Sequence, residues 1–352
     1  MEIDYINGAK TDEIFGMSKY QKEIHERIKN IKLNSIEYPL ISKKRQINSA
    51  VKYLVYPLIV KSQVKKENVK HITSQDLAYL LELMKLEKTI VTCHDLIPWV
   101  YDNNRLPTWK LNMRGLRKAD RIITVSEYSK SEIIKHVGYP EDQITVIPNA
   151  VDHNNYCVRR DREVIKKLGI PETQKVILYV GSEQPRKNVP FLLKAISELK
   201  KKLPDIKLLK IGTPQVPGAR EKLIELIETL GIEKEVIFVG SVSENDLPKY
   251  YNAADLFVFP SLYEGFGLPP LEAMACGTPV ITSNLTSLPE VVGDSAITID
   301  PYDVNAFAEA MYNLLTDEKL REQMINKGLR RAQLFNWEKS AEETLKVYQQ
   351  LS

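Results

Sequence analysis

The sequence predicts an α/β protein built from two Rossmann-like, doubly wound domains that face a cleft. Two observations carry this prediction. First, short apolar runs bounded by turn residues alternate with amphipathic segments along nearly the whole chain, a pattern typical of a parallel sheet covered by helices. Second, a chain of 352 residues is too long for one ordinary core and fits about two domains.

The strands expected in the second half are compact apolar runs. They cover Lys175–Val180, Ile206–Ile211, Glu235–Val239, Leu256–Phe259 and Pro279–Thr282. Helices are expected between them, because segments such as Phe191–Leu203 and Arg220–Leu230 carry apolar residues at i, i+3 and i+4 spacing.

The first half repeats this alternation more loosely. Its expected strands are Val69–Thr73, Thr89–Thr92, Arg121–Val125 and Gln143–Ile147. A polar, charged bridge from Asn154 to Arg162 separates the two halves. We therefore expect domains at residues 1–158 and 159–335, followed by a C-terminal helix in 336–352 that packs back on the first domain.

Composition and charge exclude several classes of protein. The net charge of +3 is too small to indicate a nucleic-acid partner. Cys93, Cys157 and Cys276 lie far apart, which indicates reduced thiols and neither a disulfide framework nor a zinc site. No signal-like start or long apolar run occurs. The expected compartment is therefore the cytoplasm.

The stretch YEGFGLPPLEAMACG, Tyr263 to Gly277, carries the strongest chemical signal. Its glycines allow close approach of a ligand to the backbone, and its prolines suit the first turn of a helix, whose unpaired N–H groups bind anions. Glu264 and Glu272 add acceptors for sugar hydroxyls. Phosphate and hydroxyl groups together indicate a nucleotide sugar.

Two other readings of this stretch compete. A dinucleotide site would need a third glycine after Gly265-Phe266-Gly267, and none follows. A tight strand-to-helix turn with solvated, capping glutamates is the better alternative, and it would be favoured if the two glutamates stood alone.

The glutamates do not stand alone, because several motifs resemble the retaining glycosyltransferases of the GT-B fold, family four (glycosyl transferases group 1). The E-x7-E spacing of Glu264 and Glu272 matches, as does the surrounding VGSVSENDLPKYYNAADLFVFPSLYEGFGLPPLEAMACGTPVITSN. YVGSEQPRKNVPFLLKAI, ITVSEYSKSEI, VIPNAVD and TCHDLIP follow the same family. The resemblance is dense over residues 88–315 and thin at the N-terminus.

The resemblance implies roles for residues of the second domain, which would bind the nucleotide sugar. Glu264 would hold hydroxyls of the donor sugar and Glu272 those of the ribose. Arg186 and Lys187 would bind the diphosphate and stabilise its developing charge, and we expect both side chains to be exposed. The remaining donor contacts would be the backbone N–H groups of Gly265, Phe266, Gly267 and Leu268, with Val242 beside the base.

In the first domain, which would bind the acceptor, the resemblance points to His94 and Gly16. His94 follows an expected strand and would contact the donor sugar near its reacting carbon. Asp95 would either orient this histidine or cap the next turn. Gly16 belongs to a loop before a helix that only partly matches the family's glycine-rich loop.

These observations predict transfer of a hexose, mannose or glucose, from a GDP- or UDP-linked donor to a glycan or lipid-linked acceptor, with retention of the α configuration. No cofactor and no metal are expected, because no Asp-x-Asp occurs and Arg186 and Lys187 supply the positive charge. A sugar-nucleotide epimerase of the same fold, or a non-catalytic partner subunit, remains an alternative.

Peripheral contact with an anionic membrane is a further expectation. Residues 1–150 hold 24 Lys and Arg against 18 Asp and Glu. Basic clusters at Lys43-Lys44-Arg45 and from Lys61 to Lys70 flank an apolar run, Tyr53 to Val60. Lysines are attracted to anionic headgroups. The alternative is that the run forms a buried helix or strand with a solvated basic border.

Overall fold

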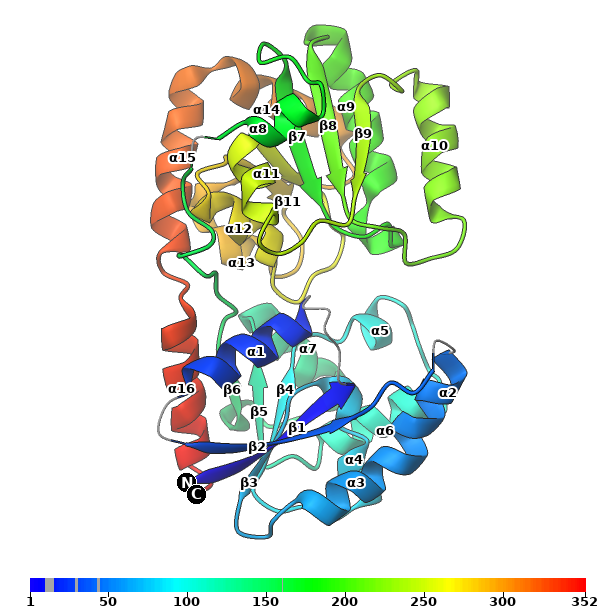
Figure 1. Cartoon of the computed structure of the whole chain (residues 1–352), viewed down its shortest axis with the longest axis vertical. Coiled ribbons are helices and arrows are strands. Elements are labelled where there is room, and N and C mark those ends of the chain that lie inside the picture. The colour runs from blue at the N-terminus through cyan, green and yellow to red at the C-terminus, as the bar shows by residue number, and fades with distance from the viewer. Residues whose placement is uncertain (10–15, 29–30, 43–44, 160) are drawn as a thin grey trace. The chain divides into compact units, whose positions relative to one another are not determined.

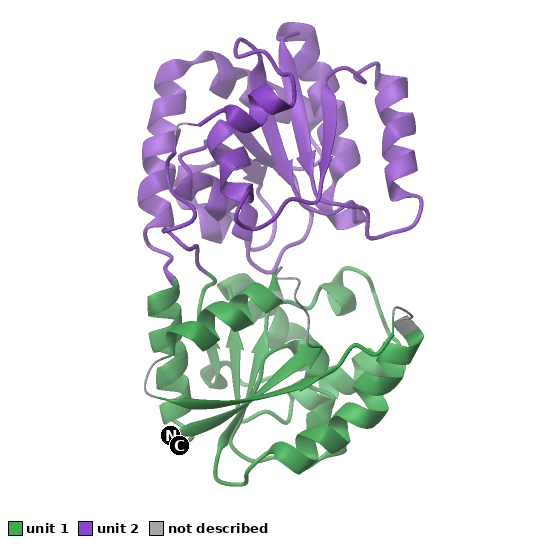
Figure 2. Cartoon of the chain, in the orientation of Figure 1, with its two compact units in different colours: residues 1–149, 337–352 green, residues 150–336 purple. Residues whose placement is uncertain are grey.

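The computed structural model describes residues 1–9, 16–28, 31–42, 45–159 and 161–352. The chain divides into two compact units (Figure 2), which we call unit 1 and unit 2. Unit 1 comprises Met1–Asn149 and Trp337–Ser352, and unit 2 comprises Ala150–Asn336. The polar bridge, in which the sequence placed the boundary at residue 158, therefore belongs to unit 2.

Unit 1 contains a parallel, six-stranded sheet in the order β2-β1-β3-β4-β5-β6 (Figure 1). Its strands are β1 (Glu2–Ala9), β2 (Lys32–Tyr38), β3 (Val69–Ile72), β4 (Thr89–Cys93), β5 (Arg121–Thr124) and β6 (Ile144–Val146). Its helices are α1 (Met17–Arg27), α2 (Arg45–Ala50), the π-helical η1 (Val51–Val55), α3 (Tyr56–Gln63), α4 (Leu80–Leu83), α5 (Ile97–Val100), α6 (Pro107–Leu116), α7 (Glu127–Val137) and α16 (Trp337–Gln349), with short 3₁₀ turns η2 (Gln75–Leu77) and η3 (Glu141–Gln143).

Unit 2 contains a second parallel, six-stranded sheet, in the order β12-β11-β10-β7-β8-β9. Its strands are β7 (Lys175–Val180), β8 (Ile206–Ile211), β9 (Val236–Gly240), β10 (Leu256–Phe259), β11 (Val280–Ser283) and β12 (Ile297–Ile299). Its helices are α8 (Glu163–Lys167), α9 (Val189–Lys202), α10 (Ala219–Leu230), α11 (Leu247–Ala253), α12 (Leu268–Ala275), α13 (Leu288–Val292), α14 (Val304–Thr316) and α15 (Glu318–Ala332), with 3₁₀ turns η4 (Pro185–Lys187) and η5 (Gly293–Ser295).

The strand order of each sheet explains why both units are doubly wound. In unit 2 the chain runs outward from β7 to β9, returns to β10 beside β7, and then runs outward in the opposite direction to β12. Because such crossovers are right-handed, the two directions place helices on opposite faces of the sheet. In Figure 1, α11 and α12 lie in front of this sheet and α9 behind it. The predicted fold class is confirmed.

The first two strands were not predicted, because polar residues interrupt their apolar pattern. Asp4 of β1 is fully buried, and its Oδ1 accepts hydrogen bonds from the side-chain amides of Asn34 (3.0 Å) and Asn68 (2.9 Å). The backbone N–H of Lys65 donates to its Oδ2 at 2.8 Å. These bonds satisfy a carboxylate that would otherwise be costly to bury, so a strand forms where the sequence pattern indicates none.

The C-terminal helix α16 belongs to the core of unit 1. Trp337 and Tyr348 are buried, and the Tyr348 hydroxyl lies 2.6 Å from Nδ1 of His71 in β3. The other ring nitrogen of His71, Nε2, lies 2.7 Å from the Thr92 hydroxyl of β4. A buried histidine with both nitrogens hydrogen-bonded thus joins the helix to two strands.

Among the described residues, no helix is both long enough and apolar enough to cross a membrane.

Candidate donor-sugar site

The candidate site of unit 2 lies where the chain reverses its direction across the sheet, between β7 and β10. β7 and β10 are neighbours in the sheet, and the chain leaves them towards opposite faces. In open parallel sheets, ligands bind outside the carboxyl ends of the strands at such a switch point. η4, with Arg186 and Lys187, follows β7, and Glu264 follows β10. The residues predicted from two distant motifs therefore meet at the edge where the fold favours a ligand.

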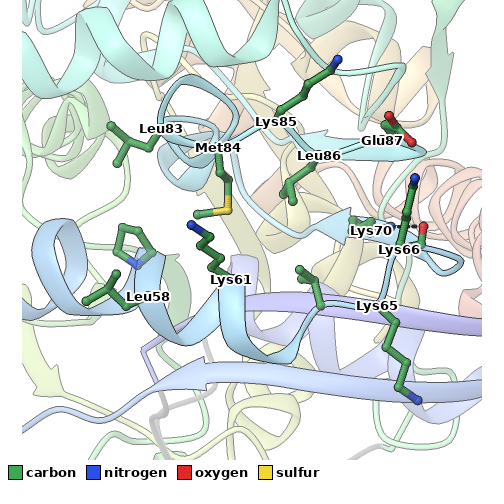
Figure 3. A pocket seen from close by; sticks show the side chains of 12 residues that line it. Leu58, Lys61, Lys65, Lys66, Lys70, Leu83, Met84, Lys85, Leu86 and Glu87 are labelled. Atoms are coloured by element: carbon green, nitrogen blue, oxygen red, sulfur yellow. Dashed lines mark hydrogen bonds between the residues drawn. The ribbon is translucent and has the colours of Figure 1, made fainter.

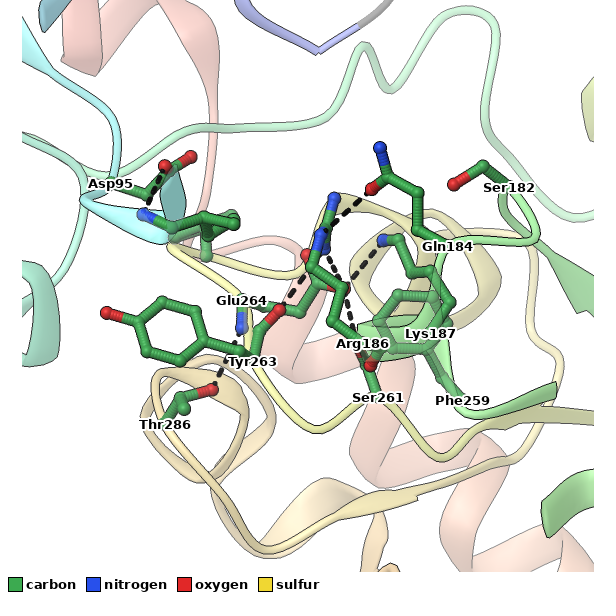
Figure 4. A network of polar contacts seen from close by, with 12 residues as sticks. Asp95, Ser182, Gln184, Arg186, Lys187, Phe259, Ser261, Tyr263, Glu264 and Thr286 are labelled. Atoms are coloured by element: carbon green, nitrogen blue, oxygen red, sulfur yellow. Dashed lines mark hydrogen bonds and ion pairs between the residues drawn. The ribbon is translucent and has the colours of Figure 1, made fainter. Parts of the chain in front are cut away.

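Glu264 is the centre of a compact polar cluster (Figure 4). Its Oε1 lies 2.6 Å from Nζ of Lys187 and 3.0 Å from Nη1 of Arg186. The Ser261 hydroxyl donates to the same oxygen at 2.5 Å. Arg186 also donates to the backbone oxygen of Tyr263 at 3.2 Å. The cluster therefore unites the two basic residues and the first glutamate of the predicted site.

The backbone around η4 keeps both cations in place. The Arg186 carbonyl accepts from the Leu262 N–H at 2.7 Å and lies 3.0 Å from the Ser261 hydroxyl oxygen. Gln184 Oε1 accepts from Nε of Arg186 at 3.1 Å. Asn188 ends the turn in the left-handed region (φ 55°) and donates to the carbonyl of Pro301 at 3.0 Å. Contacts from several segments thus fix the turn that carries the cations.

The expectation that Arg186 and Lys187 are exposed is wrong. The side chains of Arg186, Lys187 and Glu264 are only 16%, 11% and 11% exposed. The Lys187 ammonium also lies 4.8 Å from the centroid of the Phe259 ring, a favourable cation–π position. The sequence indicated a basic pair at a surface helix start, whereas the fold turns it inward towards a carboxylate.

Electrostatics keeps Glu264 ionised in this buried place. Burial would raise the pKa of its carboxyl, but the charges of Lys187 and Arg186 and their hydrogen bonds hold the pKa below its ordinary value. A charged carboxylate therefore stands between two cations. Because an incoming phosphate would compete for these cations, the cluster can exchange a protein anion for a ligand anion.

The glycine loop after Glu264 has the backbone geometry that the sequence predicted. Gly267 has φ 125°, and a Cβ there would lie 2.7 Å from the Leu288 side chain, so only glycine fits. The Ser287 hydroxyl contacts the carbonyls of Glu264 (2.9 Å) and Phe266 (2.7 Å). Gly265, Phe266 and Gly267 are buried, and Leu268 begins α12. The loop leads directly into a helix N-terminus.

Glu272 lies within α12 and is 5% exposed. The Tyr251 hydroxyl, from α11, donates to its Oε2 at 3.0 Å. Glu264 therefore contacts two cations, whereas Glu272 contacts a tyrosine.

The predicted residues of unit 1 form a group at the carboxyl edge of its own sheet. His94 follows β4 and is 6% exposed; its Nε2 donates to the Thr73 carbonyl at 3.2 Å. Its ring packs edge-to-face on Tyr20 of α1, with centroids 4.9 Å apart. Burial lowers the pKa of His94 to about 4, so the ring is neutral at pH 7. Asp95 Oδ1 accepts from the N–H of Ile97, the first residue of α5, at 2.9 Å.

Gly16 and Val242 occupy loops. Gly16 precedes α1 with φ 51°, a left-handed conformation suited to glycine. Val242 is half-buried and follows β9, whose last residue, Gly240, has φ 85°. No group of three or more His, Cys, Asp or Glu side chains arranged for a metal ion occurs in the described ranges.

Sequence reasoning missed Ser261, Gln184 and Tyr251. Ser261 carried a visible signal, because a polar residue two positions after the apolar strand LFVF stands at the ligand edge of a parallel sheet. Gln184 and Tyr251 carried no such signal. Their contacts with Arg186 and Glu272 depend on the directions of the side chains, which the sequence does not show.

Comparison with known proteins assigns the family. The Glycosyltransferase Family 4 model matches residues 29–155, and the Glycosyl transferases group 1 model matches residues 160–331. The O-antigen chain mannosyltransferase B of Escherichia coli is 37% identical over 279 residues, which cover 76% of this chain and 71% of that protein. The chain belongs to the GT-B glycosyltransferases of family four. The predicted family is confirmed.

A second sequence relative and a solved structure are also similar to this glycosyltransferase. The serotype-specific mannosyltransferase WbdA of Escherichia coli is 33% identical over 279 residues, which cover 75% of this chain. The chain matches about a third of that longer relative, since the similarity covers 34% of it. The crystal structure of Anabaena Alr3699/HepE in complex with UDP and glucose has a TM-score of 0.82 at 17% identity, with 98% of each chain covered. At this low identity, the similarity to the Anabaena protein shows only that the two chains share a fold.

Proposed function

We propose that this glycosyltransferase moves a hexose, mannose in the first place, from a nucleotide sugar to an acceptor hydroxyl with retention of the α configuration. The observation that carries the proposal is the Glu264 carboxylate held by Arg186 and Lys187 at the switch point of unit 2. Mannose is favoured by the names of the relatives, which are mannosyltransferases of Escherichia coli.

The charge of the cluster suits departure of a nucleoside diphosphate. When the bond between the anomeric carbon and the phosphate oxygen breaks, negative charge develops on the diphosphate. Arg186 and Lys187 would then exchange their contacts with Glu264 for contacts with phosphate oxygens, and fixed cations stabilise such charge strongly in a buried site. Glu264, released from the cations, would accept hydrogen bonds from hydroxyls of the sugar.

The remaining roles follow from position. Glu272 and the Gly265–Leu268 loop would contact the ribose and the phosphates, because they surround the start of α12. His94, neutral and held by Thr73, would contact the donor sugar. The new bond joins the acceptor oxygen to the anomeric carbon, and the acceptor proton passes to the departing diphosphate. We propose that two cations make a divalent metal unnecessary.

The donor is proposed as a GDP- or UDP-linked sugar, and the acceptor as a glycan or lipid-linked glycan. A donor panel tests the proposal: GDP-mannose, UDP-glucose and ADP-glucose, each with and without mannosyl oligosaccharides. We expect diphosphate release that depends on the acceptor, and a product larger by one hexose. An epimerised donor without transfer would favour an epimerase, and no reaction with any donor would favour a non-catalytic subunit.

Matched variants link this reaction to the cluster. Lys187→Ala removes one cation of the site, whereas Lys194→Ala removes an exposed lysine of the adjoining helix α9. We expect transfer to fall strongly in the first variant and to remain unchanged in the second. Equal activity of the two variants would contradict the assignment.

A further inference from the structure

Unit 1 contains a cavity of about 640 Å³ beside α3 (Figure 3). It lies at the amino ends of β3 and β4, away from the edge at which ligands of parallel sheets bind. Its basic lining consists of lysines of the cluster from Lys61 to Lys70 together with Lys85, while Lys43 and Lys44 of the other basic cluster lie outside the described residues. The carboxyl edge of the unit 2 sheet, by contrast, carries an exposed loop that contacts the residue directly before η4, the turn with the two donor cations.

This loop connects β8 to α10 and comprises residues 213–218; we call it the β8–α10 loop. All six residues are exposed. Gly212, directly before the loop, has φ 110°, and a Cβ there would overlap the carbonyl oxygen of Gly181, directly after β7, so only glycine fits. The connections that follow β7 and β8 therefore start in close contact, at the carboxyl edge where Arg186 and Lys187 lie.

Glu183, between β7 and η4, holds the end of the loop where α10 begins. Its side chain is fully buried, and its Oε1 accepts from Nζ of Lys210 in β8 at 2.8 Å and from Nε of Arg220 in α10 at 2.9 Å. Burial would raise the pKa of Glu183, but the hydrogen bonds and charges of Arg220 and Lys210 hold the pKa below its ordinary value. The Lys210 ammonium also donates to the Gly212 carbonyl at 2.8 Å. A buried, ionised cluster thus fixes both ends of the loop to the segment before η4.

Gln184 joins the middle of the loop to Arg186. Its Nε2 donates to Oε1 of Gln215 at 2.7 Å, and its Oε1 accepts from Nε of Arg186 at 3.1 Å. In Figure 4 the amide nitrogen of Gln184 points away from Arg186. Pro214 and Pro217 restrict the backbone on both sides of Gln215. Three side chains thus form a chain of hydrogen bonds from the loop to the cation.

The guanidinium fixes the direction of these hydrogen bonds. Arg186 can only donate, so Gln184 must turn its oxygen towards Arg186 and its NH2 group towards the loop. Gln215 supplies an acceptor at that place. Without this acceptor the amide could rotate and present its NH2 group to the guanidinium, so that two donors would face each other. Gln215 therefore favours the orientation of Gln184 that supports Arg186.

We propose that Gln215 is a positioning residue for Arg186 and acts on it through Gln184. This role rests on the proposed function, in which Arg186 binds the donor diphosphate. A phosphate would replace Glu264 at Nη1 of Arg186, whereas the bond between Nε and Gln184 would remain. The Gln184–Gln215 pair would then hold the guanidinium in place while its other nitrogens bind phosphate, and such preorganisation lowers the entropy lost on binding.

The coupling between loop and cation acts in both directions. If the loop favours the orientation of Arg186 that binds phosphate, a bound diphosphate must favour the hydrogen-bonded state of the loop by the same factor. A nucleoside diphosphate should therefore slow amide hydrogen exchange in the peptide that contains Gln215. The same nucleotide should leave that exchange unchanged in Gln184→Ala.

Matched variants of the loop test the proposal. Gln215→Met keeps the length of the side chain but removes the oxygen acceptor, and Gln215→Glu keeps an acceptor. In calorimetric titration Gln215→Met should bind GDP and UDP about fivefold more weakly, and its kcat/KM for transfer should fall about tenfold, because support for a charged group is lost. Gln215→Glu should stay within about threefold of the wild type, as should Val216→Ala, which changes an exposed neighbour in the same loop.

Double variants show whether Gln215 acts through Gln184. In a Gln184→Ala or an Arg186→Ala background, Gln215→Met should cause no further loss, since the path to the cation is already broken. Losses that add in the double variants would overturn the proposal. Wild-type nucleotide binding by Gln215→Met, failure of Gln215→Glu to restore it, or amide exchange that nucleotide leaves unchanged in the wild type would do the same.

Nucleotide binding by the wild type separates this role from the proposed function. A wild type that binds GDP or UDP, with Gln215→Met equal to it, would contradict only the role of Gln215. A wild type that binds neither nucleotide would contradict the proposed function and, with it, the role of Gln215.

Discussion

Nζ of Lys187 lies 2.6 Å from Oε1 of Glu264, and Nη1 of Arg186 lies 3.0 Å from the same oxygen. The two cations proposed to bind the donor diphosphate are therefore bound by a carboxylate of the protein. A ligand that takes these cations must displace Glu264 from them. We therefore expect Glu264 to weaken the binding of free nucleotide and to favour the transfer reaction.

Replacement of Glu264 by glutamine should reveal that competition. Glu264→Gln keeps an acceptor for Ser261 but removes the negative charge. We expect free nucleoside diphosphate to bind about fivefold more tightly, because the lost charge-assisted bonds correspond to roughly 1 kcal/mol. Transfer from the intact donor should fall about 100-fold. Calorimetric titration and turnover measure the two effects; weaker binding of the free nucleotide would contradict this reading.

Loss of either cation should slow the reaction. Arg186→Ala and Lys187→Ala should each raise the barrier by about 2–4 kcal/mol, as the loss of a preorganised charge does in other enzymes. Because Lys187 is buried against Glu264, its removal should also lower the free energy of unfolding by about 1–3 kcal/mol.

Turnover with a saturating donor and urea unfolding measure these two quantities. The exposed-lysine variant Lys194→Ala should change the free energy of unfolding by less than about 0.5 kcal/mol. Near-normal turnover in both Arg186→Ala and Lys187→Ala would show that the pair does not stabilise the leaving group.

Tyr251 should act by positioning Glu272. Tyr251→Phe removes the hydroxyl that donates to Glu272 Oε2 at 3.0 Å. We expect the free nucleotide and the intact donor to lose the same affinity, about tenfold or 1–1.5 kcal/mol, because the ribose is common to both ligands. Glu272→Gln should show the same equal loss. A loss confined to the intact donor would assign Glu272 to the sugar instead.

Acid should destabilise unit 1 through two buried histidines. Burial lowers the pKa of His71 to about 3 and that of His94 to about 4, against 6.5 in the ordinary state. Below pH 6.5 the two histidines are therefore protonated in the unfolded chain but still neutral in the folded protein. The free energy of unfolding falls as the pH decreases towards 4. Each histidine should remove about 2 kcal/mol at pH 5.

His94→Gln isolates one of these contributions, since its side-chain amide can still donate to the Thr73 carbonyl. Urea unfolding from pH 7 to pH 5 should show a shallower pH dependence in this variant than in the wild type. Identical slopes in the two proteins would mean that His94 is protonated equally in the folded and unfolded states.

Much of the fold was predictable because buried parallel strands are continuous apolar runs. LFVF and KVILYV were recognised on this ground and form β10 and β7. β1 was not, because Asp4 and Asn7 lie within it and become acceptable only through partners from β2 and the segment before β3. β2 lies at the sheet edge and is largely polar, and β12 has only three residues. Local patterning does not identify such strands.

The site was predictable where the chain itself specifies the geometry. Gly267 precedes a helix that begins with prolines, and Glu264 and Glu272 bracket that connection. The ion pairs of Glu264 were not predicted, because Arg186 lies 78 positions away and its side-chain direction depends on η4 and Gln184. The sequence also did not predict that Leu54 and Leu58 are exposed to solvent, since an apolar run gives no indication of which side faces solvent.

The anomeric configuration of the product tests the central claim most directly. The wild-type protein would be incubated with GDP-[13C]mannose and a mannosyl acceptor, and the one-bond carbon–hydrogen coupling at the new anomeric centre would be read by NMR at early times. We predict an α-linked product with release of GDP, formed much more slowly by the Lys187→Ala variant and at the wild-type rate by Lys194→Ala. Should GDP-mannose be inactive, the donor from the panel that supports transfer takes its place. A β-linked product from an α-linked donor, or unchanged transfer by Lys187→Ala, would contradict the account.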